Sequence, residues 1–189
     1  MLRKLVAYLH VSSSQHPTLH CSGAITSAGG RNLAKDRLAL PVLKEGGQRR
    51  CRTGSAVVTG PGEYGKLQVP YVIHAVGPNY MMFPGNFETP DELLRSAYQS
   101  SLDACVSHGI TDIAFALLSA GIYRGQRDSR DVLQIGISSI RDWVDDQEED
   151  SCGELDSVTL CGYSQKETDL LLDICEQELP NARDTPNEL

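Results

Sequence analysis

A stretch whose residue types suit a phosphate group is formed by Ser119, Ala120, Gly121, Ile122 and Tyr123. Small residues and a glycine let backbone N–H groups approach an anion, and Tyr123 would cover it as an aromatic lid. The stretch follows the apolar run 113–118, which has the length of a buried strand in a parallel sheet. Ligands of open α/β sheets bind at the carboxyl ends of strands, so we expect a ligand-binding loop here. A tight strand-to-helix turn without a ligand is the alternative.

Strand-like and helix-like segments alternate along the rest of the chain. Further strands are predicted at 55–59, 71–76 and 157–161, and the weak alternation of 4–11 could form another. Helices are predicted from Thr89 to Gly109, over 129–144 and over 166–178, with a looser helical pattern before Pro41. In the first of these, Thr89 is the expected N-cap and Pro90 the first helical residue. Ser164 and Glu167 form the expected capping box of the last. This alternation predicts one α/β domain over residues 1–179 and a frayed tail at 180–189.

Composition narrows the class of protein. The chain has 189 residues with 17 basic and 25 acidic side chains, and its net charge of −8 argues against a general nucleic-acid binder. No apolar run approaches the roughly 20 residues of a membrane span, and the N-terminus does not have the pattern of a signal peptide. The six cysteines show no CxxC spacing, so we expect free thiols, no metal site and a cytoplasmic or nuclear location.

Three motifs in order resemble the landmarks of macrodomains, a family of ADP-ribose-binding modules. They are TGSAVVT at 53–59, YVIHAVGP at 71–78 and SAGIY at 119–123. The resemblance covers about residues 23–174 and implies a three-layer α/β/α sandwich with a mixed, mostly parallel central sheet. It also implies binding of ADP-ribose without a further cofactor. Some members of the family hydrolyse ADP-ribosyl bonds or O-acetyl-ADP-ribose.

The resemblance assigns roles to individual residues. It implies that 119–123 wraps the pyrophosphate, with Tyr123 beside the distal ribose. The run Gly23-Ala24-Ile25 is similar to the family's Gly-Ala-Ile, which begins the first core helix beside a second phosphate-binding loop. Tyr163 is similar in position to an aromatic that stacks on adenine in the family. Packing at a helix cap is an alternative of equal weight for Tyr163.

The residues before Gly23 depart from the family pattern. No acidic residue precedes Leu5 to bind the adenine amine, and 8–13 stands where the family has Asn-Ala-Ala-Asn. Residues 15–20 replace its glycine loop, and Ser22 stands where related hydrolases have an aspartate. A serine hydroxyl is a poor general base, so no catalytic residue is assigned. A missing first strand is a further interpretation, which would leave a central strand as an unprotected edge.

Histidines and cysteines offer little chemistry in this sequence. A nucleophilic dyad of His20 and Cys21 is disfavoured, because adjacent side chains on an extended segment point to opposite faces. His74, inside a predicted strand, is expected to be a hydrogen-bonded histidine of the core or of the sheet end.

Three functions remain open, and the first is preferred. The first is a divergent macrodomain that binds ADP-ribose or a mono-ADP-ribosylated protein. The second is a hydrolase of ADP-ribosyl groups or O-acetyl-ADP-ribose, and the third is an interaction domain without a ligand. The departures at the Asn and Asp positions favour binding over catalysis. We expect a monomer with no membrane association.

Overall fold

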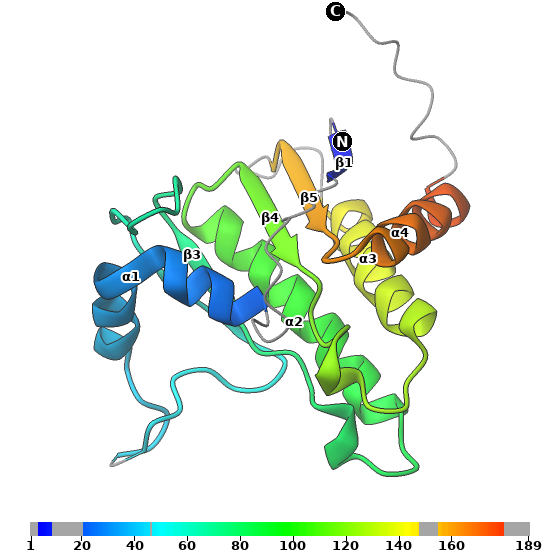
Figure 1. Ribbon diagram of the computed structural model, residues 1–189, viewed down its shortest axis with the longest axis horizontal. Helices are drawn as coiled ribbons and strands as arrows, with labels where there is room; N and C mark the ends of the chain where they lie inside the picture. Colours follow the sequence, from blue (N-terminus) through cyan, green and yellow to red (C-terminus); the bar gives the residue numbers. More distant parts are fainter. Residues whose placement is uncertain (1–3, 9–20, 46, 148–154, 180–189) are drawn as a thin grey trace, which may run out of the picture.

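The computed structural model describes residues 4–8, 21–45, 47–147 and 155–179 (Figure 1). Its elements, in chain order, are β1 (Lys4–Tyr8), α1 (Cys21–Ala39), β2 (Ala56–Thr59), β3 (Val72–Ala75), η1 (Tyr80–Met82), α2 (Glu88–Ser107), β4 (Asp112–Ala116), η2 (Ile122–Arg124), α3 (Ser129–Asp145), β5 (Ser157–Cys161) and α4 (Gln165–Glu178). The predicted alternation of strands and helices is confirmed. The expected tail at 180–189 and the histidine-rich segment 15–20 lie outside the described residues.

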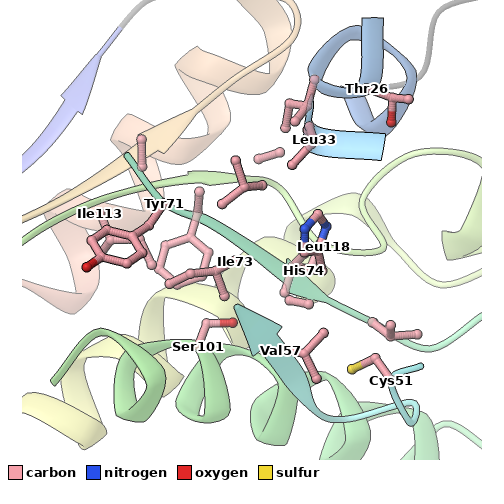
Figure 2. Close-up of a pocket in the computed structure, with 18 of the residues that line it drawn as sticks. Thr26, Leu33, Cys51, Val57, Tyr71, Ile73, His74, Ser101, Ile113 and Leu118 are labelled. Atoms are coloured by element: carbon pink, nitrogen blue, oxygen red, sulfur yellow. The ribbon is translucent and has the colours of Figure 1, made fainter. Parts of the chain in front are cut away.

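The strands form two small sheets. Strands β1, β5 and β4 pair in that order and all run parallel, with Ser157 opposite both Lys4 and Asp112. Strands β2 and β3 pair antiparallel, with Thr59 opposite Val72. Helix α1 lies on one side of β3 and β4 and α2 on the other, which gives three layers (Figures 1 and 2). Among the described residues, no strand pairs with the remaining edge of β4 or of β3.

Helix α2 supplies a large share of the core. Its buried face consists of Pro90, Leu94, Ala97, Tyr98, Ser101, Leu102 and Cys105. The Tyr98 ring lies 5.1 Å from Phe115 of β4, and Gly136 of α3 lets the Tyr98 ring approach closely. A Cβ at position 136 would lie 2.9 Å from the Tyr98 hydroxyl. These contacts lock α2 between the parallel sheet and α3.

The ends of α2 correct one prediction and confirm another. The helix begins at Glu88, so Thr89 lies inside it and is not the N-cap; the Thr89 N–H donates to the Asn86 side chain at 3.3 Å. The predicted stop is confirmed, because Gly109 has a φ of 64° and the Ile110 N–H bonds to Cys105 O at 2.9 Å.

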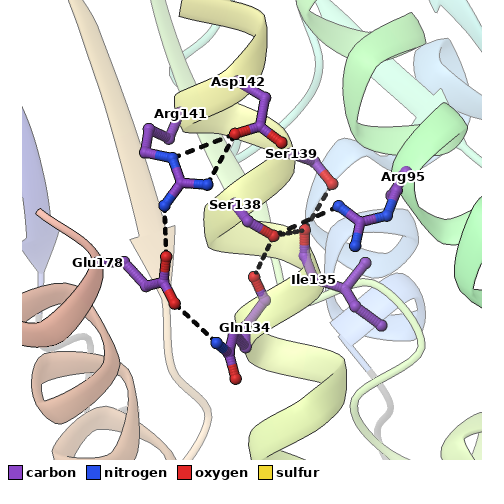
Figure 3. A network of polar contacts seen from close by, with 8 residues as sticks. All are labelled: Arg95, Gln134, Ile135, Ser138, Ser139, Arg141, Asp142 and Glu178. Atoms are coloured by element: carbon purple, nitrogen blue, oxygen red, sulfur yellow. Dashed lines mark hydrogen bonds and ion pairs between the residues drawn. The ribbon is translucent and has the colours of Figure 1, made fainter.

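Helices α3 and α4 are joined by polar side chains (Figure 3). Glu178 near the end of α4 accepts from Gln134 at 2.7 Å and pairs with Arg141, which also bonds Asp142 at 2.8 Å. At the start of α4, Ser164 accepts from the Glu167 N–H at 3.3 Å, as the predicted capping box requires. This cap, three residues after the end of β5, defines the start of α4.

His74 of β3 faces a cavity beside α1 and is held in its neutral form (Figure 2). Its Nε2 lies 3.0 Å from the hydroxyl of Thr59, which is buried and itself donates to Val72 O at 3.3 Å. The hydroxyl oxygen therefore accepts from the neutral ring. Burial, together with the nearby Arg37 charge, lowers the pKa of His74 to about 4.

The lowered pKa of His74 makes stability depend on pH. Between about pH 6.5 and pH 4, the unfolded chain binds a proton at His74 that the folded chain does not, so the free energy of unfolding falls as the pH falls. A tenfold difference in proton affinity between the folded and unfolded chains corresponds to about 1.4 kcal/mol. Lowering the pKa from 6.5 to about 4 would therefore remove about 3 kcal/mol, and partial exposure of the ring reduces this loss to about 2 kcal/mol.

We expect the variant His74→Gln to lose about 2 kcal/mol less stability than the wild type between pH 7 and pH 4, because it cannot take up this proton. Urea unfolding at both pH values measures the difference. The control is Gln126→Asn, a neutral change at an exposed position, which should keep the wild-type dependence on pH. Parallel curves for the wild type and His74→Gln would contradict the prediction.

Candidate functional site

Strand β4 ends beneath a buried tyrosine. The Leu118 N–H donates to the hydroxyl of Tyr98 at 3.1 Å, and burial raises the pKa of Tyr98 to about 12. The next residue, Ser119, has a φ of 56°, in the left-handed region that favours glycine. Its hydroxyl donates to Pro78 O at 2.7 Å, which ties the turn to the chain that follows β3. Strained backbone of this kind is concentrated at functional sites.

The loop after this turn carries unused backbone donors. Two backbone bonds within residues 121–125 close the 3₁₀ turn η2. In the described part of the chain, the N–H groups of Gly121, Ile122 and Tyr123 meet no acceptor. A Cβ added to Gly121 would have no heavy atom within 4 Å, so the space in front of this residue is open. Successive free N–H groups beside an open space form an anion-binding nest.

A cavity of about 1970 Å³ brings most of the predicted site residues together. All five residues of 119–123 line it, as do Gly23 and Ile25 at the start of α1 and Tyr163 after β5. Ala24 is exposed and does not line the cavity. The side chains of Ile122, Tyr123 and Tyr163 are 60%, 57% and 56% exposed, so each apolar surface is available to a ligand.

Tyr163 has a backbone role as well as a free ring. Its N–H donates to the Glu167 carboxylate at 2.9 Å, which completes the capping of α4. The ring stays at the mouth of the cavity. Both alternatives for this residue, the helix cap and the stacking platform, are therefore compatible with its position.

The cavity continues between β3 and β4, where sequence reasoning identified no site. Figure 2 shows Leu33 of α1 on one side of the strands and Ser101 of α2 on the other, with His74 and Leu118 beside the space. Arg37 of α1 also lines it and donates to the Thr26 hydroxyl at 3.0 Å. The amphipathic pattern of α1 is weak, so no sequence pattern indicated that Arg37 faces a cavity.

The described cavity residues offer little catalytic chemistry. Their only carboxylates are Asp112, at the far end of β4 from the loop, and Glu167, which holds the Tyr163 N–H. Burial raises the pKa of the Cys51 thiol, which makes it a poor nucleophile. No cluster of three potential metal ligands exists among the described residues. None of the described helices is long and apolar enough to cross a membrane. This geometry suits binding of an anion, and the described lining places no carboxylate beside the loop.

Comparisons with known proteins agree with this architecture. The family model "Macro domain" matches residues 15–135. A macro domain-containing protein of Cupriavidus necator is 37% identical over 120 residues, which are 64% of this chain and 62% of that protein. A macro domain-containing protein of Listeria monocytogenes is 31% identical over 133 residues, or 70% of this chain and 69% of that one. An O-acetyl-ADP-ribose deacetylase of Cronobacter turicensis is 29% identical over 134 residues, or 71% and 72%. The chain thus spans less than two thirds of the length of the first of these relatives.

Solved structures share the fold. A variant of the Oceanobacillus iheyensis macrodomain, with ADPR bound, superposes with a TM-score of 0.71 at 20% identity over 87% of this chain and 80% of that one. The Trypanosoma brucei macrodomain in complex with ADP-ribose gives 0.62 at 20% identity over 82% and 56%. The family model covers well over half of the 189 residues, and the chain therefore belongs to the macrodomain family.

Proposed function

We propose that this protein binds ADP-ribose, free or attached to a protein, with its diphosphate on the loop 119–123. The observation that carries the proposal is the set of N–H groups of Gly121, Ile122 and Tyr123, which meet no acceptor among the described residues and belong to a loop that lines the cavity. A protein with a net charge of −8 must hold an anion by local donors of this kind, because its overall field repels it.

The rest of the cavity suits the remaining parts of such a ligand. Tyr123 and Ile122 lie beside the loop and would cover the distal ribose, and Tyr163 offers an exposed ring for adenine stacking. Gly23 allows the first turn of α1 to approach the ligand closely. Two macrodomain structures with the same fold hold ADPR or ADP-ribose, which supports this class of ligand.

Hydrolysis of an ADP-ribosyl bond is the second candidate. It is favoured by relatives named O-acetyl-ADP-ribose deacetylase and ADP-ribose glycohydrolase. The sequence weighs against it, because Ser22 precedes Gly23 where a carboxylate would orient water. We therefore place binding first.

The first prediction is that ADP-ribose binds at least about tenfold more tightly than AMP, because the loop contacts a diphosphate and a second ribose that AMP lacks. Isothermal titration calorimetry with both ligands, and with ADP as an intermediate, measures the difference. Equal affinities for ADP-ribose and AMP would place recognition at the base and overturn the assignment of the loop.

The second prediction concerns Gly121→Glu, which we expect to abolish binding of ADP-ribose while the protein stays folded. The new side chain meets no protein atom near its Cβ, but its carboxylate would occupy the phosphate space and repel the anion. The matched control is Gln126→Glu, which adds the same charge at an exposed position of the same segment and should retain binding. Unchanged affinity in Gly121→Glu, with a wild-type circular dichroism spectrum, would exclude the loop as the cradle.

The third prediction is that the wild type releases ADP-ribose from a mono-ADP-ribosylated protein slowly or not at all, and that Ser22→Asp gains activity. General-base assistance is worth about 10²–10⁴-fold, which sets the scale of the gain. The control is Ser22→Asn, which matches the size of aspartate without a carboxylate. Fast turnover by the wild type that Gly121→Glu eliminates would instead make the protein a hydrolase that works through its phosphate loop.

A further inference from the structure

Two loops border the candidate site, and a buried corner joins them. The first loop leaves β3 and contains η1 with Tyr80, and the second leaves β4 and contains η2. Near the strand ends they are tied by the bond from Ser119 Oγ to Pro78 O. Farther out, a Cβ at Gly125 would lie 3.0 Å from the Met81 side chain, so the two turns touch.

One carboxylate, Asp91 in the first turn of α2, binds both loops at this corner. The hydroxyl of Tyr80, in η1, donates to Asp91 Oδ1 at 2.7 Å. Arg127, which follows η2, donates from Nη2 to Asp91 Oδ2 at 2.8 Å and from Nε to Oδ1 at 3.4 Å. A two-pronged pair of this kind fixes orientation as well as distance.

The surroundings strengthen these bonds. The side chains of Asp91 and Arg127 are only 20% and 22% exposed, so solvent screens their charges less than at the surface. The guanidinium carbon also lies 4.9 Å above the centre of the Phe87 ring. Burial and the Asp91 carboxylate raise the pKa of Tyr80, so its hydroxyl remains a donor.

We propose that Asp91 is a positioning residue for the phosphate loop, because it fixes η1 and η2 against α2 and so keeps the free N–H groups of 121–123 aimed at the ligand. The choice of ADP-ribose as the ligand rests on the proposed function, whereas the role of Asp91 in holding the two loops does not. An anion nest binds best when its donors are held in place before the ligand arrives, since no ordering entropy is then lost. Asp91 does not itself line the cavity.

The chain provides a matched control. Asp131 of α3 also pairs with Arg127, at 2.6 Å, but it is 41% exposed and makes no bond to η1. Removal of Asp131 takes one carboxylate from the same guanidinium and leaves both loops attached to Asp91.

The test compares Asp91→Ala with Asp131→Ala in two measurements. In hydrogen exchange on the ligand-free protein, we expect the hydrogen-bonded amides of Arg124, Gly125 and Arg127 to exchange at least about tenfold faster in Asp91→Ala, while amides of β5 and α4 keep wild-type rates. In calorimetry, ADP-ribose affinity should fall about 10–100-fold in Asp91→Ala and less than about threefold in Asp131→Ala. Saturating ADP-ribose should return the amides of Arg124, Gly125 and Arg127 in Asp91→Ala to slow exchange.

Two milder variants protect the test against misfolding. Tyr80→Phe removes one hydroxyl, and Arg127→Met removes the other partner of Asp91 while it keeps an unbranched chain over Phe87. Because both act through one carboxylate, their effects on loop exchange should be less than additive. Additive effects, or equal exchange in Asp91→Ala and Asp131→Ala, would overturn the proposal. Faster exchange throughout Asp91→Ala, with no selective change in Tyr80→Phe, would also overturn it. If no variant or wild type binds ADP-ribose, the proposed function fails, and the exchange results still decide the role of Asp91.

Discussion

The hydrogen bond from the Leu118 N–H to the buried Tyr98 hydroxyl is the constraint on which the site depends. It fixes the backbone two residues beyond the end of β4, directly before the turn at Ser119 with its positive φ. Tyr98 is in turn held because Gly136 of α3 gives its ring room. The packing of α2 against α3 therefore helps to position the loop 119–123, although neither helix contributes a residue to that loop.

Helix α2 thus controls the loop at two places, which explains how a short exposed segment keeps one shape. Tyr98 acts on the start of the loop through the backbone, and Asp91 acts beyond its end through Arg127. The two residues lie two turns apart on one helix, so their separation is fixed. The loop spans the interval between them without needing a core of its own, as functional loops on rigid supports do.

The sequence predicted the parts of the molecule that depend on local signals. Gly109 indicated the end of α2 and Ser164 the start of α4, because a helix cap depends on only a few adjacent residues. The strand at 157–161 was predicted with the observed bounds of β5, whereas 71–76 was predicted too long against the observed β3 of Val72–Ala75. Strand length depends on pairing partners that the sequence does not reveal. The same limit applies to the Asp91 corner, whose members are 11 and 36 residues apart. For the candidate site, the small residues indicated that 119–123 forms a loop at the strand end, and the structure places this loop at the cavity, whereas Arg37 and His74 were brought there by tertiary packing alone.

The break between the two sheets gives a bound ligand a mechanical role. Gly23 and Ile25 of α1 line the cavity, as do His74 of β3 on the antiparallel pair and the loop 119–123 and Tyr163, which follow strands of the parallel sheet. No backbone ladder among the described residues crosses from β3 to β4. A molecule that contacts both sides would link the two sheets across this seam, and its binding would stabilise the folded domain. Helix α2 packs against β3 and, through Tyr98, against Phe115 of β4, so a bound ligand would reinforce a seam that one helix already spans.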